Sequence, residues 1–128
     1  MHIRDDTANI DAALQEAFEV GRGAGAPLVI SHHKLSGQAN HGRSPQTLAL
    51  IEAASRQQDV CLDCYPYDAA STMLLPERVH LSREVLITWS SAEPAAAGRS
   101  LFQMAKERGL TPQALAERLM PAGVVNFS

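Results

Sequence analysis

Three polar positions that could build a catalytic site recur at a regular step along the chain. His2 lies 30 residues before His32, and Tyr65 lies 33 residues after His32. One strand–helix–strand unit takes about 30 residues, so this spacing predicts that each position follows one strand of a parallel α/β repeat. Such folds build their sites at the carboxyl ends of the strands. We therefore expect the three positions to lie at one edge of a sheet.

The histidines are candidates for metal binding or acid–base chemistry. His32 and His33 end an apolar run, and neutral imidazoles are good metal ligands. Adjacent strand residues point to opposite faces, so at most one of the two faces the site if the strand stays regular. The alternative interpretation of His32 and His33 is a hydrogen-bonded histidine in a loop. The alternative interpretation of His2 is an exposed residue at the chain terminus. Lys34 could hold an anionic group as a point charge, or lie in solvent as most lysines do.

Cysteines, tyrosines and acids follow the same strands. Cys61 and Cys64 match a C-x-x-C pattern, but strand positions three apart lie roughly 10 Å apart on opposite faces, beyond disulfide reach. We expect one buried strand thiol and a second near the strand end. Tyr65 and Tyr67 line either a pocket or a packed rim. Spacing does not distinguish among four acids near strand ends: Asp5, Asp6, Asp63 and Asp68.

The elements that position these residues alternate between helix and strand in the first half. Apolar side chains on one face predict a helix over 9–22, with Asn9 as its N-cap. The run at 28–31 predicts a strand buried on both faces. Ser44-Pro45 is a helix-start signal, and residues 59–64 predict the next strand.

The second half differs in character, and we expect it to form an insertion or subdomain. The expected organisation is residues 1–73 as βα units and residues 74–128 as a subdomain leading towards a last barrel strand. The expected elements are a loop at 65–72, strands at 78–82 and 84–91, helices starting after Ser100 and Thr111, and a strand at 124–127.

Composition limits the class of protein. The chain has 128 residues, with 11 Lys+Arg against 14 Asp+Glu and a net charge of −3, which argues against a nucleic-acid partner. No apolar run approaches the roughly 18–20 residues that span a bilayer, and the start lacks the apolar core of a signal peptide. These features predict a cytoplasmic protein without a membrane partner. A closed (β/α)₈ barrel needs about 200 residues or more, so the chain can supply only part of one.

Three stretches resemble the N-acyl-D-amino-acid deacylases of the amidohydrolase superfamily. They are HIRD at 2–5, LVISHHKLSGQANHGRSPQTLALIEAA at 28–54, and VCLDCYPYDAASTMLL at 60–75. The resemblance implies an α/β fold: a partial TIM barrel, from the end of strand 5 to the strand 7/8 connection, with a small α+β insertion. It also implies zinc-dependent hydrolysis of N-acyl-D-amino acids to a D-amino acid and a carboxylate.

The same resemblance implies roles for individual residues. His2 and His32 match two zinc ligands of the family. The family's strand-1 H-x-H pair and bridging cysteine have no match, and its general acid/base aspartate would lie beyond Ser128. We therefore expect the isolated chain to be an incomplete, inactive fragment. Residues matching those that bind the substrate's carboxylate end are Lys34, Tyr65 and Ser71.

Two other interpretations stay open, and both concern partners or substrates. The chain could be a non-catalytic α/β remnant that self-associates. It could also be a segment of another zinc amidohydrolase that acts on linear or cyclic amides. An unclosed parallel sheet exposes strand edges, so a homo-oligomer or a complementing chain is expected in addition to the small-molecule N-acyl-D-amino acid.

Overall fold

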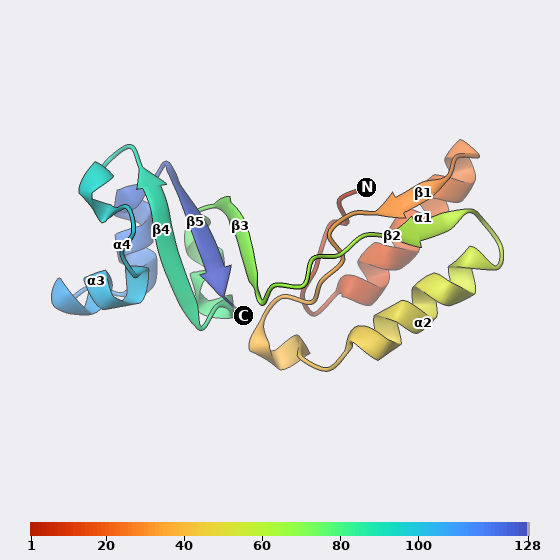
Figure 1. Ribbon diagram of the computed structural model, residues 1–128, viewed down its shortest axis with the longest axis horizontal. Coiled ribbons are helices and arrows are strands. Elements are labelled where there is room, and N and C mark those ends of the chain that lie inside the picture. The colour runs from red at the N-terminus through yellow and green to blue at the C-terminus, as the bar shows by residue number, and fades with distance from the viewer. Residues whose placement is uncertain (128) are drawn as a thin grey trace. The chain divides into compact units, whose positions relative to one another are not determined.

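The computed structural model describes residues 1–127, which divide into two compact units (Figure 1). The first is Met1–Pro66, and the second begins at Tyr67. This division differs from the expected boundary after residue 73, because strand β3 (Ala69–Met73) pairs with the last strand of the second unit. No helix among the described residues is long and apolar enough to cross a membrane.

The first unit contains the alternating helices and strands that the sequence predicts. Strands β1 and β2 pair in parallel, with Val29 opposite Cys61. The elements in chain order are α1 (Ile10–Ala24), β1 (Leu28–Ile30), a short 3₁₀ helix (Gln38–Asn40), α2 (Ser44–Ser55) and β2 (Val60–Leu62).

The core of the first unit lies between the helices and one face of this sheet. Leu14 and Phe18 of α1 are buried against Ile30 of β1, in a cluster that also contains residues of α2 and β2. Val29 is 42% exposed although its neighbours in β1 are buried. The expectation of a strand buried on both faces is therefore wrong, since successive residues alternate and the helices cover only one face.

Helix α1 has a glycine cap at its C-terminus but no side-chain cap at its N-terminus. Gly25 ends the helix in the left-handed conformation, at φ 62°, which glycine adopts without a steric cost. Asn9 makes no side-chain cap to the helix. Asn9 therefore occupies the predicted N-cap position without a side-chain cap, and its Nδ2 donates to Oδ2 of Asp5 at 3.4 Å.

The second unit is a three-stranded antiparallel sheet with two helices. The strand order is β3-β5-β4. The other elements are a 3₁₀ helix (Pro76–Leu81), β4 (Glu84–Ser90), a second 3₁₀ helix (Pro94–Ala96), α3 (Leu101–Glu107), α4 (Pro112–Leu119) and β5 (Ala122–Phe127).

Two local predictions in this unit are wrong. Residues 69–73, expected in part as loop, form β3, because pairing with β5 supplies the hydrogen bonds that a weakly β-forming Ala-Ala-Ser-Thr stretch does not predict. Residues 78–82, expected as a strand, fall largely in the first 3₁₀ helix. Pro76 favours that helical turn because its ring fixes φ and removes a donor that a helix start does not use.

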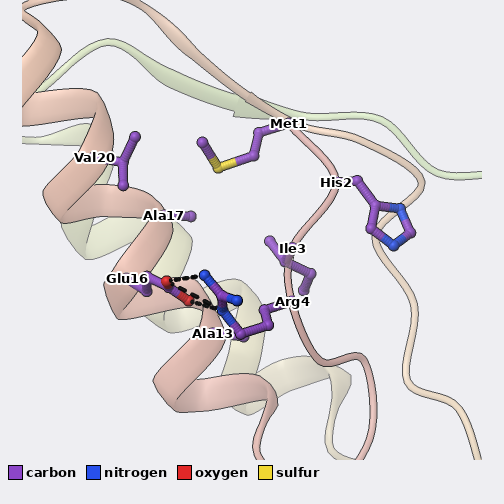
Figure 2. Close-up of a pocket in the computed structure, with 8 residues that line it drawn as sticks. All are labelled: Met1, His2, Ile3, Arg4, Ala13, Glu16, Ala17 and Val20. Atoms are coloured by element: carbon purple, nitrogen blue, oxygen red, sulfur yellow. Dashed lines mark hydrogen bonds and ion pairs between the residues drawn. The ribbon is translucent and has the colours of Figure 1, made fainter.

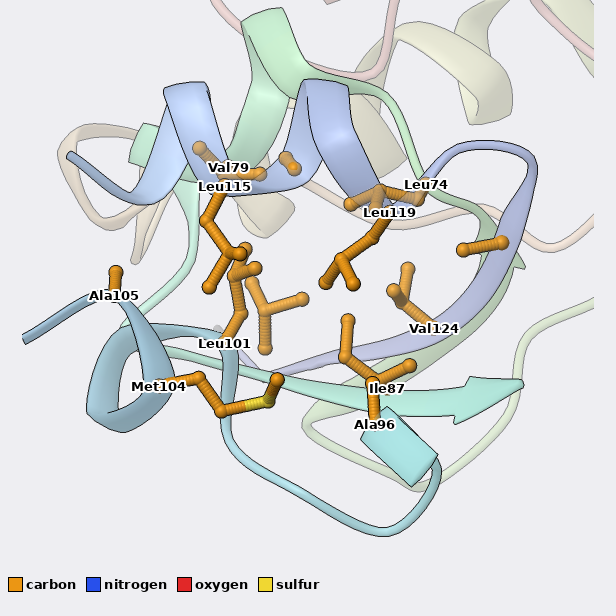
Figure 3. Packing of buried hydrophobic residues seen from close by; sticks show 13 residues of the cluster. Leu74, Val79, Ile87, Ala96, Leu101, Met104, Ala105, Leu115, Leu119 and Val124 are labelled. Atoms are coloured by element: carbon orange, nitrogen blue, oxygen red, sulfur yellow. The ribbon is translucent and has the colours of Figure 1, made fainter. Parts of the chain in front are cut away.

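The core of the second unit is built from α3, α4 and one face of the sheet (Figure 3). Both helices begin where the sequence predicts, and each has a side-chain cap: Ser100 Oγ accepts from Gln103 N at 3.1 Å, and Thr111 Oγ1 accepts from Ala114 N at 3.1 Å. The largest buried side chains are Leu74, Val85, Ile87, Leu101, Met104, Leu115, Leu119 and Val124.

Candidate metal and substrate site

The ends of three adjacent extended segments meet in the first unit. The backbone N–H of Ser31 donates to Met1 O at 2.9 Å, and the amino group of Met1 donates to Val29 O. The N-terminal segment therefore lies along β1 on the edge opposite β2. As the 30-residue step predicts, His2 and His32 each follow one of two neighbouring segments, and they lie together at the carboxyl end of the sheet.

The two imidazole rings are in direct contact. Nδ1 of His2 lies 2.7 Å from Nε2 of His32, and the ring centroids are 4.6 Å apart at an interplanar angle of 60°. At this distance one ring nitrogen donates a hydrogen bond and the other accepts it. His2 is exposed and His32 is half-buried, so both rings can be reached from solvent.

Lys34 carries its positive charge beside this pair. Its Nζ lies 3.3 Å from Nδ1 of His32 and 3.0 Å from Oδ2 of Asp6. The Asp6 carboxylate also accepts from Ser36 Oγ at 3.1 Å, and the Asp6 carbonyl accepts from Ser36 N at 2.7 Å. The Lys34 side chain is only 26% exposed, so its ammonium is held in place rather than free in solvent.

His33 takes a different role from His32. Its Nε2 lies 2.9 Å from Oγ1 of Thr47, which is fully buried in α2, and its Nδ1 is buried with no partner. Burial, and secondarily the nearby charge of Lys34, lower the pKa of His33. The neutral His33 ring therefore packs into the first unit against Thr47, whereas His32 contacts His2.

The two other predicted site residues, Tyr65 and Ser71, belong to different units. Tyr65 is half-buried and follows β2 in the first unit, whereas Ser71 is exposed in β3 of the second unit, opposite Val125. Cys61 and Cys64 are both free and exposed. The expected buried strand thiol is wrong, because Cys61 shares the uncovered face of the sheet with Val29.

Two acids at this edge were not singled out by the sequence. Asp6 pairs with Lys34, and Asp63 follows β2 and accepts the backbone N–H of His32 at 2.6 Å. Asp63 lies 31 residues after His32, which is nearly the same step that separates the two histidines. That recurrence is the signal that could have distinguished Asp63 from the other acids.

A separate pocket of about 330 Å³ lies between the N-terminal segment and α1 (Figure 2). An ion pair between Arg4 and Glu16, 2.7 Å long, closes one side. Hydrogen bonding to Arg4 lowers the pKa of Glu16. His2 also lines this pocket, but its ring points away from α1 in this view, and His32 is not among the lining residues. The apolar lining comes from Met1, Ile3, Ala13, Ala17 and Val20.

Comparison with known proteins shows what the chain is similar to. No family model matches the chain. A D-aminoacylase from Alcaligenes xylosoxydans xylosoxydans is 50% identical over 126 residues, which cover 98% of this chain and 26% of the relative. The chain matches one segment of the N-acyl-D-amino-acid deacylase family. An N-acyl-D-glutamate deacylase from the same organism is 42% identical over 128 residues, with similar coverage.

Solved structures of deacylases show the same fold over this segment. A D-aminoacylase structure, described as defining a novel subset of amidohydrolases, matches with a TM-score of 0.95 at 50% identity, over 99% of this chain and 27% of that chain. An N-acyl-D-glutamate deacylase from Bordetella bronchiseptica, in complex with zinc and a phosphonate inhibitor, matches with a TM-score of 0.91 at 41% identity, over 98% and 27%. The chain thus spans about a quarter of these deacylases.

The histidine pair fits one metal ion of the kind seen in that zinc complex. Two imidazole nitrogens on one tetrahedral zinc lie about 3.3 Å apart, so the 2.7 Å pair needs to open by only about 0.6 Å. A metal-bound Nε2 leaves the ring hydrogen on Nδ1, so the Lys34 contact to that atom belongs to the metal-free ring. Residues 1–127 contain no cluster of three or more His, Cys, Asp or Glu side chains that could hold a metal.

Proposed function

We propose that this chain is the segment of a zinc-dependent N-acyl-D-amino-acid deacylase that supplies two metal ligands and part of the carboxylate-binding site. The observation that carries the proposal is the convergence of Nδ1 of His2 and Nε2 of His32 at 2.7 Å, at the carboxyl ends of neighbouring segments. The 41–50% identity to deacylases over this segment supports the same assignment.

In this proposal β1 and β2 are neighbouring strands of a (β/α)₈ barrel. The parallel pairing of β1 with β2, and the helices on one face, agree with that architecture. The uncovered face, with Val29 42% exposed beside Cys61, would then point to the barrel interior. Strands from the rest of the barrel, or from a complementing chain, would cover it.

Each site residue has a defined task in the reaction. His2 and His32 would hold the zinc, which polarises the amide carbonyl and lowers the pKa of bound water. The ammonium of Lys34, oriented by Asp6, would bind the α-carboxylate of the substrate as a charged hydrogen-bond donor. The resemblance assigns binding of the same carboxylate to Tyr65 and to Ser71.

The proton-transfer group is not assigned to any residue of this chain. Hydrolysis of an amide needs a positioned acid or base to protonate the leaving amine, and the resemblance places that aspartate beyond Ser128. Two histidines also fall short of the three protein ligands usual in catalytic zinc sites. The isolated chain should therefore show no turnover of an N-acyl-D-amino acid.

A chimeric enzyme tests the proposal. The matching segment of the Alcaligenes D-aminoacylase is replaced by this chain, and hydrolysis of N-acetyl-D-methionine is measured. We expect activity, and we expect Lys34→Ala to raise KM about 10- to 100-fold, as loss of one charged hydrogen bond implies.

Lys106→Ala is the matched control, because Lys106 is exposed in α3 of the second unit. It should leave KM unchanged. A folded chimera without activity, or equal KM values for the Lys34→Ala and unsubstituted chimeras, would contradict the proposal.

A further inference from the structure

His32 adopts a backbone conformation that its residue type does not favour. Its φ is 43°, and among residues 1–127 it is the one non-glycine residue with a positive φ. A side chain with a Cβ pays roughly 1–3 kcal/mol for such a conformation, which persists only where the surroundings hold it. Something next to His32 must therefore stabilise this turn.

Asp63 makes three hydrogen bonds to the residues around this turn. Its backbone N–H donates to Ile30 O at 3.1 Å, and its carbonyl accepts from His33 N at 2.8 Å. Both bonds are backbone pairing that any residue except proline could make. Its Oδ1 in addition accepts the N–H of His32 at 2.6 Å, and only a side chain with an acceptor at this reach can make that bond.

The left-handed turn decides where the His32 ring points. A residue in a regular strand alternates faces with its neighbours, and His32 would then continue the pattern of β1. In the observed turn its Nε2 instead lies 2.7 Å from Nδ1 of His2. The carboxylate of Asp63 thus acts on the histidine pair through the backbone of His32.

We propose that Asp63 is a positioning residue: its carboxylate holds the His32 backbone in the left-handed turn that aims the imidazole at His2. The claim that the paired nitrogens then bind a metal rests on the proposed function. The claim that Asp63 sets the position of the ring stands on the geometry of this chain alone.

The test is nuclear magnetic resonance of the 128-residue chain. Hydrogen exchange of the His32 amide and the ring-to-ring contact of His2 with His32 are measured in four proteins. We expect Asp63→Ala to speed exchange of the His32 amide about tenfold and to abolish the ring contact. Asp63→Asn should preserve both, because its amide oxygen can accept the same bond. Asp59→Ala is the control, since Asp59 is an exposed acid just before β2.

Asp63→Ala with both signals unchanged would overturn the proposal. If Asp63→Ala does not fold, the double variant with His32→Gly decides, because glycine adopts a positive φ freely. A folded double variant supports the proposal, and an unfolded one overturns it, since the loss then does not arise from the turn at His32.

A zinc titration separates this proposal from the proposed function. We expect zinc to shift both ring signals of the unsubstituted chain, with the apparent affinity about tenfold weaker in Asp63→Ala and unchanged in Asp63→Asn. If zinc moves neither ring of the unsubstituted chain while the amide result holds, the two histidines do not bind zinc without the rest of the site, and the positioning role of Asp63 stands.

Discussion

At the scale of single residues, Asp5 stabilises the entry to α1 through its charge. Its Oδ1 accepts from the hydroxyl and the backbone N–H of Thr7, both at 2.6 Å. These hydrogen bonds, the one from the Thr7 side chain first, hold the pKa of Asp5 below its usual value of 3.8. The unfolded chain therefore binds a proton at higher pH than the folded chain does.

This difference predicts how stability depends on pH. The contribution of Asp5 is present above about pH 4 and is lost as pH falls through the lowered pKa of the folded state. Asp5→Ala should cost about 1 kcal/mol of unfolding free energy at pH 7, and the cost should shrink towards pH 2. Urea unfolding across this range measures it. A cost that stays constant with pH would contradict the role of the charge.

The same scale shows which parts of the site the sequence can predict. His2 and His32 were singled out by residue type and spacing and Lys34 by its place after the histidine pair, and the structure brings these three side chains together. Asp6 and Asp63 were not, because one pairs with a lysine whose loop conformation is not encoded in spacing, and the other binds a backbone N–H. Because every residue except proline has a backbone N–H, the residue type at position 32 does not indicate that Asp63 binds there.

At the scale of elements, Gly123 in β5 permits the close approach of β4. A Cβ built on Gly123 would overlap Nε1 of Trp89 and lie 2.9 Å from Oγ1 of Thr88. Trp89 is directly opposite Gly123 in the register, next to an irregularity in β4. The indole therefore lies over the position where β5 has no side chain.

Gly123→Ala should destabilise the second unit by about 1–3 kcal/mol, because the ring must move to make room. Gly23→Ala is the matched control: nothing lies within 4 Å of a Cβ there, and Gly23 is in α1. Alanine in place of a helical glycine should raise stability by up to about 1 kcal/mol. Chemical denaturation compares the two, and equal effects would refute the packing argument.

Sequence patterns predicted elements well where they carry a strong local signal. Helix α1 has an apolar face, and α4 has an N-cap followed by proline, so both were located correctly. Strand β3 was missed because its residues have little β preference and its pairing partner, β5, lies about fifty residues away along the chain. Long-range pairing of this kind has no local sequence signature.

At the scale of the whole molecule, each unit has a hydrophobic core of its own. Leu14 belongs to the cluster of the first unit, and Leu115 belongs to that of the second. Both side chains are fully buried. Truncation of either to alanine should cost about 2–5 kcal/mol.

We expect this cost to fall mainly on the unit that contains the substitution. Leu14→Ala should raise amide hydrogen exchange in residues 1–66 more than in the second unit, and Leu115→Ala should do the reverse. Exchange followed residue by residue measures both. If each variant raises exchange equally in the two units, the cores are not energetically separate.

The central claim is that His2 and His32 are ligands of one zinc ion, and the zinc content of the purified chimera tests it most directly. Metal analysis is made of the unsubstituted chimera and of His2→Ala, His32→Ala and His80→Ala, the last being the control because His80 is exposed in the second unit. The account predicts that the first two substitutions lose zinc and that His80→Ala retains it. Folded His2→Ala and His32→Ala chimeras with full zinc content would contradict it.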